Sequence, residues 1–180
     1  GLVGYTNAGK STVFNALTEG GAYADDRVFA TLMTRTRKWE LRQGLEVMLS
    51  DTVGFVRELP HPLIASFRAT LEEATHADLL LIVVDVSDPA AELHYQTVME
   101  TLDALFEESA RIEGPDWKAP NRLVVLNKTE PLPDNAEVLI WQAREPSAIP
   151  ICALDLKDED SPQRAALAEA VASRLPTLRV

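Results

Sequence analysis

The segment with the clearest chemical meaning is GYTNAGKS, from Gly4 to Ser11, near the start of the 180-residue chain. It satisfies the spacing G-x-x-x-x-G-K-S, between a short apolar run and a helical pattern, which is the context that this motif needs. Glycines let the backbone turn tightly, so that N–H groups converge on phosphate oxygens. The following helix N-terminus adds partial positive charge. The pattern predicts a phosphate-binding loop.

Side chains of this loop have separate expected roles. Lys10 is predicted to reach the β- and γ-phosphates as a catalytic cation, and the Ser11 hydroxyl to ligate Mg²⁺. Asn7 is either a candidate ligand for K⁺ beside the phosphates or a turn residue present for its backbone conformation. The predicted nucleotide-binding residues of this segment are Gly4, Asn7, Ala8, Gly9, Lys10, Ser11 and Thr12.

A second motif, DTVG, runs from Asp51 to Gly54 after an apolar strand pattern. Asp51 is predicted to hold Mg²⁺ through a bound water. The Gly54 N–H is predicted to point at the γ-phosphate, a contact that disappears after hydrolysis. Phe55 follows, where nucleotide-hydrolysing switch proteins place a water-orienting glutamine. Because phenylalanine cannot orient water, we expect slow intrinsic hydrolysis.

The segment between these motifs must supply a hydroxyl that ligates Mg²⁺ only when a triphosphate is bound. FATLMTRTR offers Thr31, Thr34 and Thr36. We favour Thr31 as metal ligand and catalytic residue, because Thr36 lies nearly on the next strand. Phe29 is predicted to contact the nucleotide. The arginines of the two switch segments are interpreted as surface charges: Arg27, Arg35, Arg37 and Arg57.

The segment LNKTE, from Leu126 to Glu130, matches the guanine-reading pattern Asn-Lys-x-Asp except at its last position. Asn127 is predicted to support the phosphate loop, and the Lys128 stem to cover the base. Glu130 has the two oxygens of aspartate on one more methylene, so it forms the same fork only if the loop retreats by about 1.5 Å. We expect a cost on the order of 1–3 kcal/mol, with GTP still preferred. Relaxed specificity that admits ATP is the alternative.

The elements that position these motifs alternate between short apolar runs and helical patterns, which is typical of a parallel sheet with crossover helices. Strands are expected at residues 2–3, 37–42, 45–50, 78–86, 123–127 and 148–152. Helices are expected at 10–18, 63–75, 90–112, 134–143 and 161–175, the last with Ser161 as N-cap. A hairpin turn at Gln43 and Gly44 makes one strand antiparallel. The predicted fold is α/β, a three-layer sandwich with a six-stranded, mostly parallel sheet, as in Ras-like P-loop NTPases.

Composition limits the classes of partner. There are 17 basic and 28 acidic residues, so the net charge of −11 disfavours nucleic-acid binding, and no sequence-specific contact is expected. The longest apolar run is too short to span a membrane, and no signal peptide is evident. The single cysteine, Cys152, cannot form an internal disulfide, which favours a cytoplasmic location. It is expected to be buried on a strand, and the three histidines lack metal-ligand spacing.

Several segments together resemble the HflX branch of the Obg–HflX GTPases: GYTNAGKST, DDRVFATL, DTVGFVRELPH, SFRATLEEATHADLLLIVVDVSDP and NK. The resemblance implies a GTPase domain over residues 1–180 that binds GTP, GDP and Mg²⁺. It also implies an N-terminal domain outside this chain, and action on the large ribosomal subunit or in ribosome splitting. A nucleotide-sensing module with negligible turnover is the alternative.

The chain departs from the family pattern at three places. The family usually continues FATL with Asp-Pro-Thr-Thr-Arg, whereas residues 33–37 here read Met-Thr-Arg-Thr-Arg. The last guanine-contacting motif is usually Ser-Ala and reads Cys152-Ala153, where the Ala153 N–H is still expected to meet guanine O6. Glu130 is the third departure. These departures affect the first-switch anchor and the base-reading motif.

Overall fold

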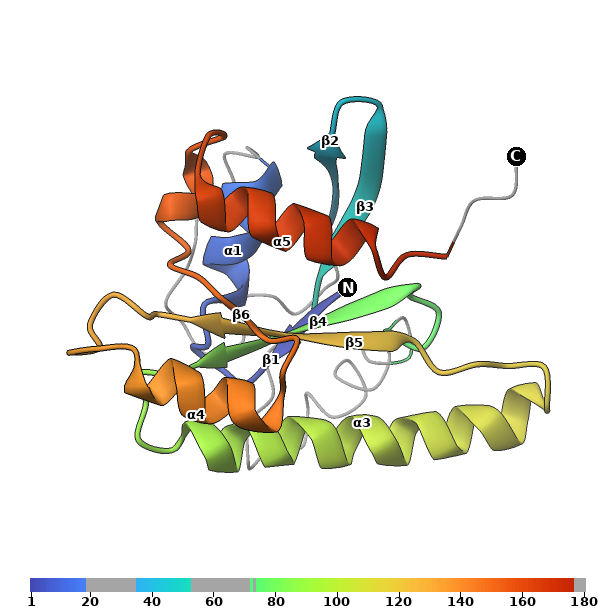
Figure 1. The fold of residues 1–180 in the computed structure, drawn as a ribbon. Coiled ribbons are helices and arrows are strands. Elements are labelled where there is room, and N and C mark those ends of the chain that lie inside the picture. The colour runs from blue at the N-terminus through green and yellow to red at the C-terminus, as the bar shows by residue number, and fades with distance from the viewer. Residues whose placement is uncertain (19–34, 53–71, 73, 177–180) are drawn as a thin grey trace.

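The computed structural model describes residues 1–18, 35–52, 72 and 74–176 (Figure 1). The expected helix at 63–75 falls almost entirely outside these residues. The described part is an α/β fold around a six-stranded sheet with the order β2-β3-β1-β4-β5-β6. No helix of this part is long and apolar enough to cross a membrane.

The strands lie close to the positions expected from the sequence. They are β1 Leu2–Gly4, β2 Arg35–Arg42, β3 Leu45–Asp51, β4 Leu79–Asp85, β5 Asn121–Asn127 and β6 Ile149–Pro150. Neighbouring strands pair in parallel except β2 and β3, which form the antiparallel hairpin. Gly44 turns this hairpin with a φ of 79°, a conformation that suits glycine. The predicted fold class is confirmed.

Three strand predictions were wrong in extent by two residues or more, among them β5, which begins at Asn121 rather than residue 123. β2 begins at Arg35 rather than residue 37, because Arg35 still pairs with Asp51 of β3. β6 covers Ile149–Pro150 rather than 148–152. The chain turns immediately after it, since the Cys152 carbonyl accepts from the Asp155 N–H and opens a short 3-10 helix. Cys152 is buried, as expected, but it lies beyond the strand.

The helices are α1 Lys10–Thr18, α3 Ala91–Glu113, α4 Ala136–Arg144 and α5 Pro162–Ala172, with the 3-10 helix η2 Asp155–Lys157. α1 has the predicted bounds. α5 begins as predicted, because the Ser161 hydroxyl accepts from the Arg164 N–H and Pro162 takes the first helical position. It ends before residue 175, and η2 was not anticipated.

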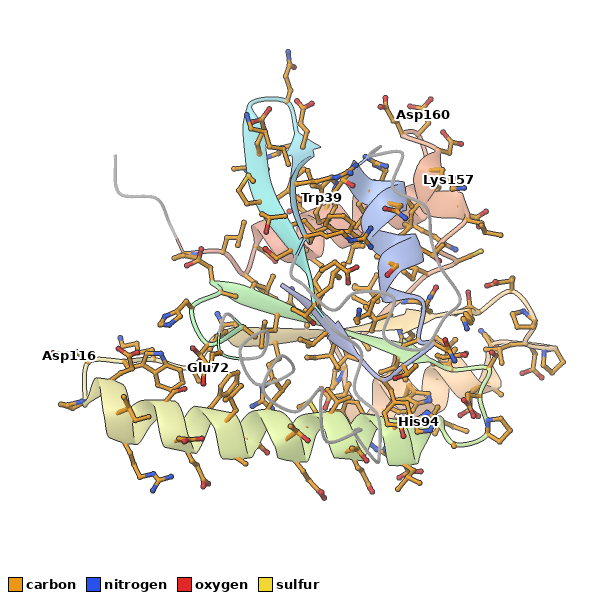
Figure 2. All side chains as sticks on the ribbon, turned by 180° about the vertical axis from the view of Figure 1, so that it is seen from behind. Trp39, Glu72, His94, Asp116, Lys157 and Asp160 are labelled. Atoms are coloured by element: carbon orange, nitrogen blue, oxygen red, sulfur yellow. The ribbon has the colours of Figure 1, made fainter. Side chains whose placement is uncertain are left out.

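The helices cover both faces of the sheet and so complete the three layers (Figure 1). α1 and α5 lie over one face, where the core includes Phe14, Leu17 and Trp39, which points inward from the hairpin (Figure 2). α3 and α4 cover the other face, where the core includes Leu102 and Trp141. Burying each large apolar side chain contributes about 1.5–3 kcal/mol, so both layers hold the sheet in place.

The carboxyl ends of the strands gather the predicted motifs at one edge of the sheet. β1 ends at Gly4, β3 at Asp51 and β5 at Asn127. β4 ends at Asp85, which pairs in register with Asn127. Because ligands of parallel α/β sheets bind outside these carboxyl ends, this edge is the candidate site.

Candidate nucleotide-binding site

The loop between β1 and α1 is closed by short backbone hydrogen bonds. The Ala8 N–H donates to the Tyr5 carbonyl at 3.0 Å, and the Val13 N–H donates to the Gly9 carbonyl at 2.9 Å. Asn7 and Gly9 have φ angles of 64° and 95°. Left-handed backbone conformations that alternate with right-handed ones turn successive N–H groups toward one concavity, which is the geometry of an anion-binding nest.

Glycine is required at both ends of this loop. A Cβ on Gly4 would lie 2.7 Å from the Val83 carbonyl oxygen of β4. A Cβ on Gly9 would overlap the side-chain amide of Asn127, and its positive φ would be strained in any L-residue. The backbone of this loop therefore approaches two neighbouring strands more closely than a side chain allows.

The buried carboxylate of Asp51 lies directly beneath the loop. Asp51 is fully buried, and its Oδ1 is 2.9 Å from Lys10 Nζ. Its Oδ2 accepts from the Ser11 hydroxyl at 3.1 Å and from Arg35 Nη2 at 3.1 Å. Lys10 also donates to the Thr52 carbonyl. The structure thus brings together the predicted phosphate cation and two of the three predicted metal ligands.

These oxygen donors fit Mg²⁺. A serine hydroxyl and a carboxylate within hydrogen-bond distance are hard ligands of the kind that Mg²⁺ prefers, alongside phosphate and water oxygens. No group of three or more His, Cys, Asp or Glu side chains occurs in the described segments that would suit another metal. The residues present are therefore suited to a metal that arrives together with a phosphate ligand.

Asn127 at the end of β5 joins the phosphate loop to the last predicted motif. Its side chain is almost fully buried. Nδ2 donates to the Ala8 carbonyl at 2.9 Å, as predicted from the sequence, and Oδ1 accepts from the Ala153 N–H at 3.2 Å. The donor and the acceptor of this amide are both hydrogen-bonded, so the phosphate loop and the loop that carries Ala153 are held at a fixed separation.

Lys128 lies at the same sheet edge and contacts the phosphate loop. Its Nζ donates to the Asn7 carbonyl at 2.8 Å and pairs with Asp85 Oδ2 at 3.0 Å. The Lys128 backbone has a φ of 60°. The side chain therefore spans from the end of β5 to the phosphate loop, and its role in covering a base stays a prediction. Asp85 was not predicted. The sequence feature that could have indicated it is an acidic residue at the end of an apolar strand pattern, which places it on the same sheet edge.

Glu130 and Cys152 lie on adjoining loops. The Thr129 N–H and hydroxyl both donate to the Ile151 carbonyl, at 3.4 and 3.0 Å. Burial raises the pKa of the Cys152 thiol, and a hydrogen bond to Glu130 and the Glu130 charge raise that pKa further. Hydrogen bonds with Asp155 and Leu154 backbone groups act in the opposite direction. Two of the departures from the family pattern are therefore neighbours in space.

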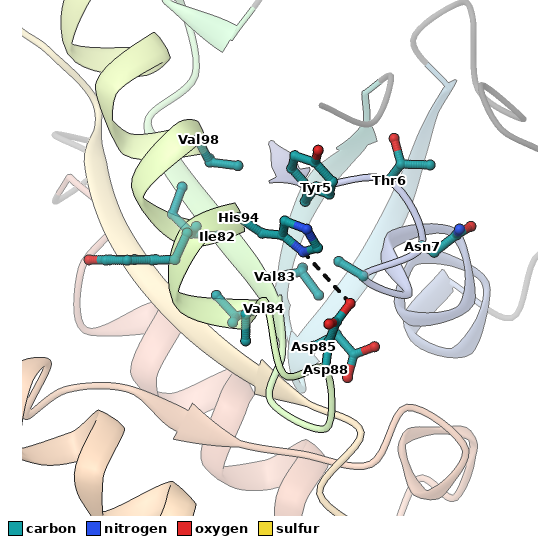
Figure 3. A pocket seen from close by; sticks show the side chains of 13 residues that line it. Tyr5, Thr6, Asn7, Ile82, Val83, Val84, Asp85, Asp88, His94 and Val98 are labelled. Atoms are coloured by element: carbon teal, nitrogen blue, oxygen red, sulfur yellow. Dashed lines mark ion pairs between the residues drawn. The ribbon is translucent and has the colours of Figure 1, made fainter. Parts of the chain in front are cut away.

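A small pocket lies behind the phosphate loop, between β4 and the start of α3 (Figure 3). Tyr5 stacks on His94 with ring centroids 3.7 Å apart and planes 4° apart. His94 Nδ1 is 3.7 Å from Asp88 Oδ2. This stack links the loop to α3. It was not predicted, because no local sequence pattern pairs two rings so far apart in the chain.

Several predicted residues lie outside the described part of the chain: Phe29, Thr31, Gly54 and Phe55. Thr12 lies in the first turn of α1, next to Ser11. Arg35, interpreted as a surface charge, instead forms an ion pair with the buried Asp51 carboxylate and is only 34% exposed. The reason is the register of the β2–β3 hairpin, which places the two residues opposite each other.

Comparisons with known proteins agree with this arrangement. A family model described as a 50S ribosome-binding GTPase matches residues 1–128. The GTPase HflX of Chlamydia pneumoniae is 47% identical over 135 residues, which cover 75% of this chain and 26% of that protein. The GTPase HflX of Magnetococcus marinus is 54% identical over 110 residues, which cover 61% of this chain and 26% of that protein.

A solved GTP-binding protein from Sulfolobus solfataricus, in complex with GDP, is 27% identical with a TM-score of 0.60. That match covers 96% of this chain and 51% of the other. The chain spans about a quarter of the length of the two HflX relatives. The family match nevertheless includes the phosphate loop, Asp51 and the Asn127–Lys128 pair. The chain therefore belongs to the 50S ribosome-binding GTPase family, as a GTPase domain of the HflX type.

Proposed function

We propose that this chain is a GTP-binding and GTP-hydrolysing molecular switch. The observation that carries the proposal is the buried Asn127 amide, which connects the Ala8 carbonyl of the phosphate loop with the Ala153 N–H. This connection holds the Ala153 backbone beside the phosphate loop, which Lys128 also contacts through the Asn7 carbonyl. Membership of a GTPase family supports guanine as the base bound beside these groups.

In the proposed site, each residue near the phosphates has one role. Lys10 would leave Asp51 for the β- and γ-phosphates, while Ser11, Asp51 and Thr31 would hold Mg²⁺. The bound metal would supply charge neutralisation at the phosphoryl group. The Gly54 N–H would contact the γ-phosphate, and Asn7 would take part in a K⁺ site. Asn7 is exposed and has an αL backbone, so its side chain is accessible from the phosphate side.

The proposed partner of the full-length protein is the large ribosomal subunit, with ribosome splitting as the proposed action. The description of the family as 50S ribosome-binding supports this partner. We further propose a cytoplasmic protein with an N-terminal domain preceding the GTPase domain. The net charge of −11 argues against sequence-specific nucleic-acid binding by this domain, and no membrane partner is proposed.

Single-turnover GTP hydrolysis by the full-length protein tests the proposal, measured with and without 50S subunits, in KCl and in NaCl. We expect slow basal hydrolysis, stimulation by 50S subunits and faster hydrolysis in KCl. GTP binding with negligible turnover under every condition would instead indicate a nucleotide sensor. A rate with 50S subunits equal to the basal rate would contradict the ribosomal role.

Base choice provides a separate prediction. Glu130→Asp is expected to raise GDP affinity about tenfold and to widen the preference for GDP over ADP, because the shorter side chain forms the two-oxygen fork without displacing the loop. Competition of GDP and ADP against fluorescent GDP measures both quantities. Glu137→Asp, on the exposed face of α4, is the matched control and should change neither. Equal or tighter ADP binding by the unmodified chain would indicate an ATPase.

A further inference from the structure

Two side chains share one oxygen of the buried Asp51 carboxylate. Ser11 Oγ and Arg35 Nη2 each lie 3.1 Å from Asp51 Oδ2, while Lys10 Nζ lies 2.9 Å from Oδ1. Ser11 and Asp51 are proposed metal ligands, so the Arg35 guanidinium contacts the same carboxylate oxygen that one proposed ligand carries and the other contacts. A permanent positive charge of the chain thus lies at the cation site.

The fold holds Arg35 there through two elements, the β2–β3 hairpin and α1. The residue begins β2 and is paired in the ladder with Asp51, the last residue of β3. Its guanidinium lies over the ring of Phe14 in α1, 5.5 Å from the ring centroid. Phe14 is fully buried, so this face of the guanidinium rests on a fixed surface. The arginine is therefore pre-positioned by the hairpin register and by α1.

Chemistry makes Arg35 a competitor of Mg²⁺ at this carboxylate. Guanidinium remains charged at every accessible pH and binds carboxylates through directed N–H groups. Mg²⁺ needs nearly octahedral oxygen ligands and keeps its waters, so it cannot share Asp51 Oδ2 with a guanidinium without crowding and like-charge repulsion. Lys10 has the phosphates as an alternative partner when a nucleotide binds, whereas Arg35 remains tied to the ladder.

We propose that Arg35 is an internal cation that competes with Mg²⁺ for Asp51 and so sets the Mg²⁺ concentration at which nucleotide binding tightens. The inference rests on the proposed guanine-nucleotide function and deepens it. Nucleotide binding with a high Mg²⁺ requirement follows, since the metal must displace a side chain that is already in place.

The test is a Mg²⁺ titration of fluorescent-GDP affinity, a readout that does not depend on hydrolysis. Arg35→Thr and Arg35→Gln are expected to lower the half-saturating Mg²⁺ concentration about tenfold, because a charge-assisted contact to Asp51 is removed. Glutamine keeps a neutral donor of similar reach in case threonine leaves Asp51 too poorly paired to fold. Lys38→Gln is the matched control. Lys38 lies on the same strand with an exposed side chain, pairs with exposed Glu46 and should leave the midpoint unchanged.

The outcomes separate this inference from the function on which it rests. A lowered midpoint in both Arg35 variants, with the control unchanged, supports the competition. GDP binding by all variants with the same or a higher midpoint overturns the role of Arg35 and leaves the GTPase proposal standing. Absence of guanine-nucleotide binding by the unmodified, folded chain at any Mg²⁺ concentration overturns both.

Discussion

Lys10→Met is expected to lower the affinity for GTP by about 100-fold or more, because the substitution removes charge-assisted contacts to two phosphates. It should also lower the free energy of unfolding of the nucleotide-free chain by about 2–3 kcal/mol. Lys10 is itself buried and pairs with the fully buried Asp51, so methionine leaves that carboxylate short of a counter-charge. Nucleotide titration and urea unfolding measure the two effects separately.

A double substitution distinguishes these two consequences. In Lys10→Met/Asp51→Asn the buried charge is absent together with its partner, so part of the unfolding free energy should return while GTP affinity should not. Lys157→Met, at an exposed position of η2, controls for the loss of a lysine in general. GTP affinity within threefold of the unmodified chain would show that Lys10 stays on Asp51 in the bound state.

Gly9→Ala is expected to abolish measurable GDP binding and to lower the free energy of unfolding by about 2–4 kcal/mol. The new methyl group would overlap the Asn127 amide at a backbone φ of 95°. Asn127 could then keep its bonds to Ala8 and Ala153 only if the phosphate loop moved away. Calorimetric titration with GDP and urea unfolding check the two parts of this expectation.

Gly44→Ala is the matched control for backbone strain. Gly44 also has a positive φ, 79°, but a Cβ there would meet nothing within 4 Å. It should lower the free energy of unfolding by only about 1 kcal/mol and leave GDP binding intact. If both alanines had the same modest effect, the close approach between Gly9 and Asn127 would not matter for the site.

The parts of the fold that could be predicted have local signals. The bounds of α1 follow from the motif before it, and the N-cap of α5 follows from Ser161 and Pro162. The sheet edge could also be inferred, because Asp51 and Asn127 each end an apolar run. Local spacing is sufficient for these features, since each depends on residues only a few positions apart.

The parts that could not be predicted depend on register and on three-dimensional turns. The predicted strand begins at residue 37, so it does not include the pairing of Arg35 with Asp51. The length of β6 depends on the turn into η2, where the Cys152 carbonyl accepts a hydrogen bond from the Asp155 N–H. The stack of Tyr5 on His94 joins residues from the phosphate loop and α3. None of these contacts has a periodic pattern in the sequence.

The Asn127 amide also determines when the site can exist. Its two bonds reach 119 residues back to Ala8 and 26 residues forward to Ala153. During synthesis the phosphate loop is made well before Asn127 and Ala153, and the frame around it is complete only after residue 153 has been added and folded. We therefore expect a nascent chain that stops short of residue 153 to carry the phosphate-loop motif without a complete nucleotide-binding site.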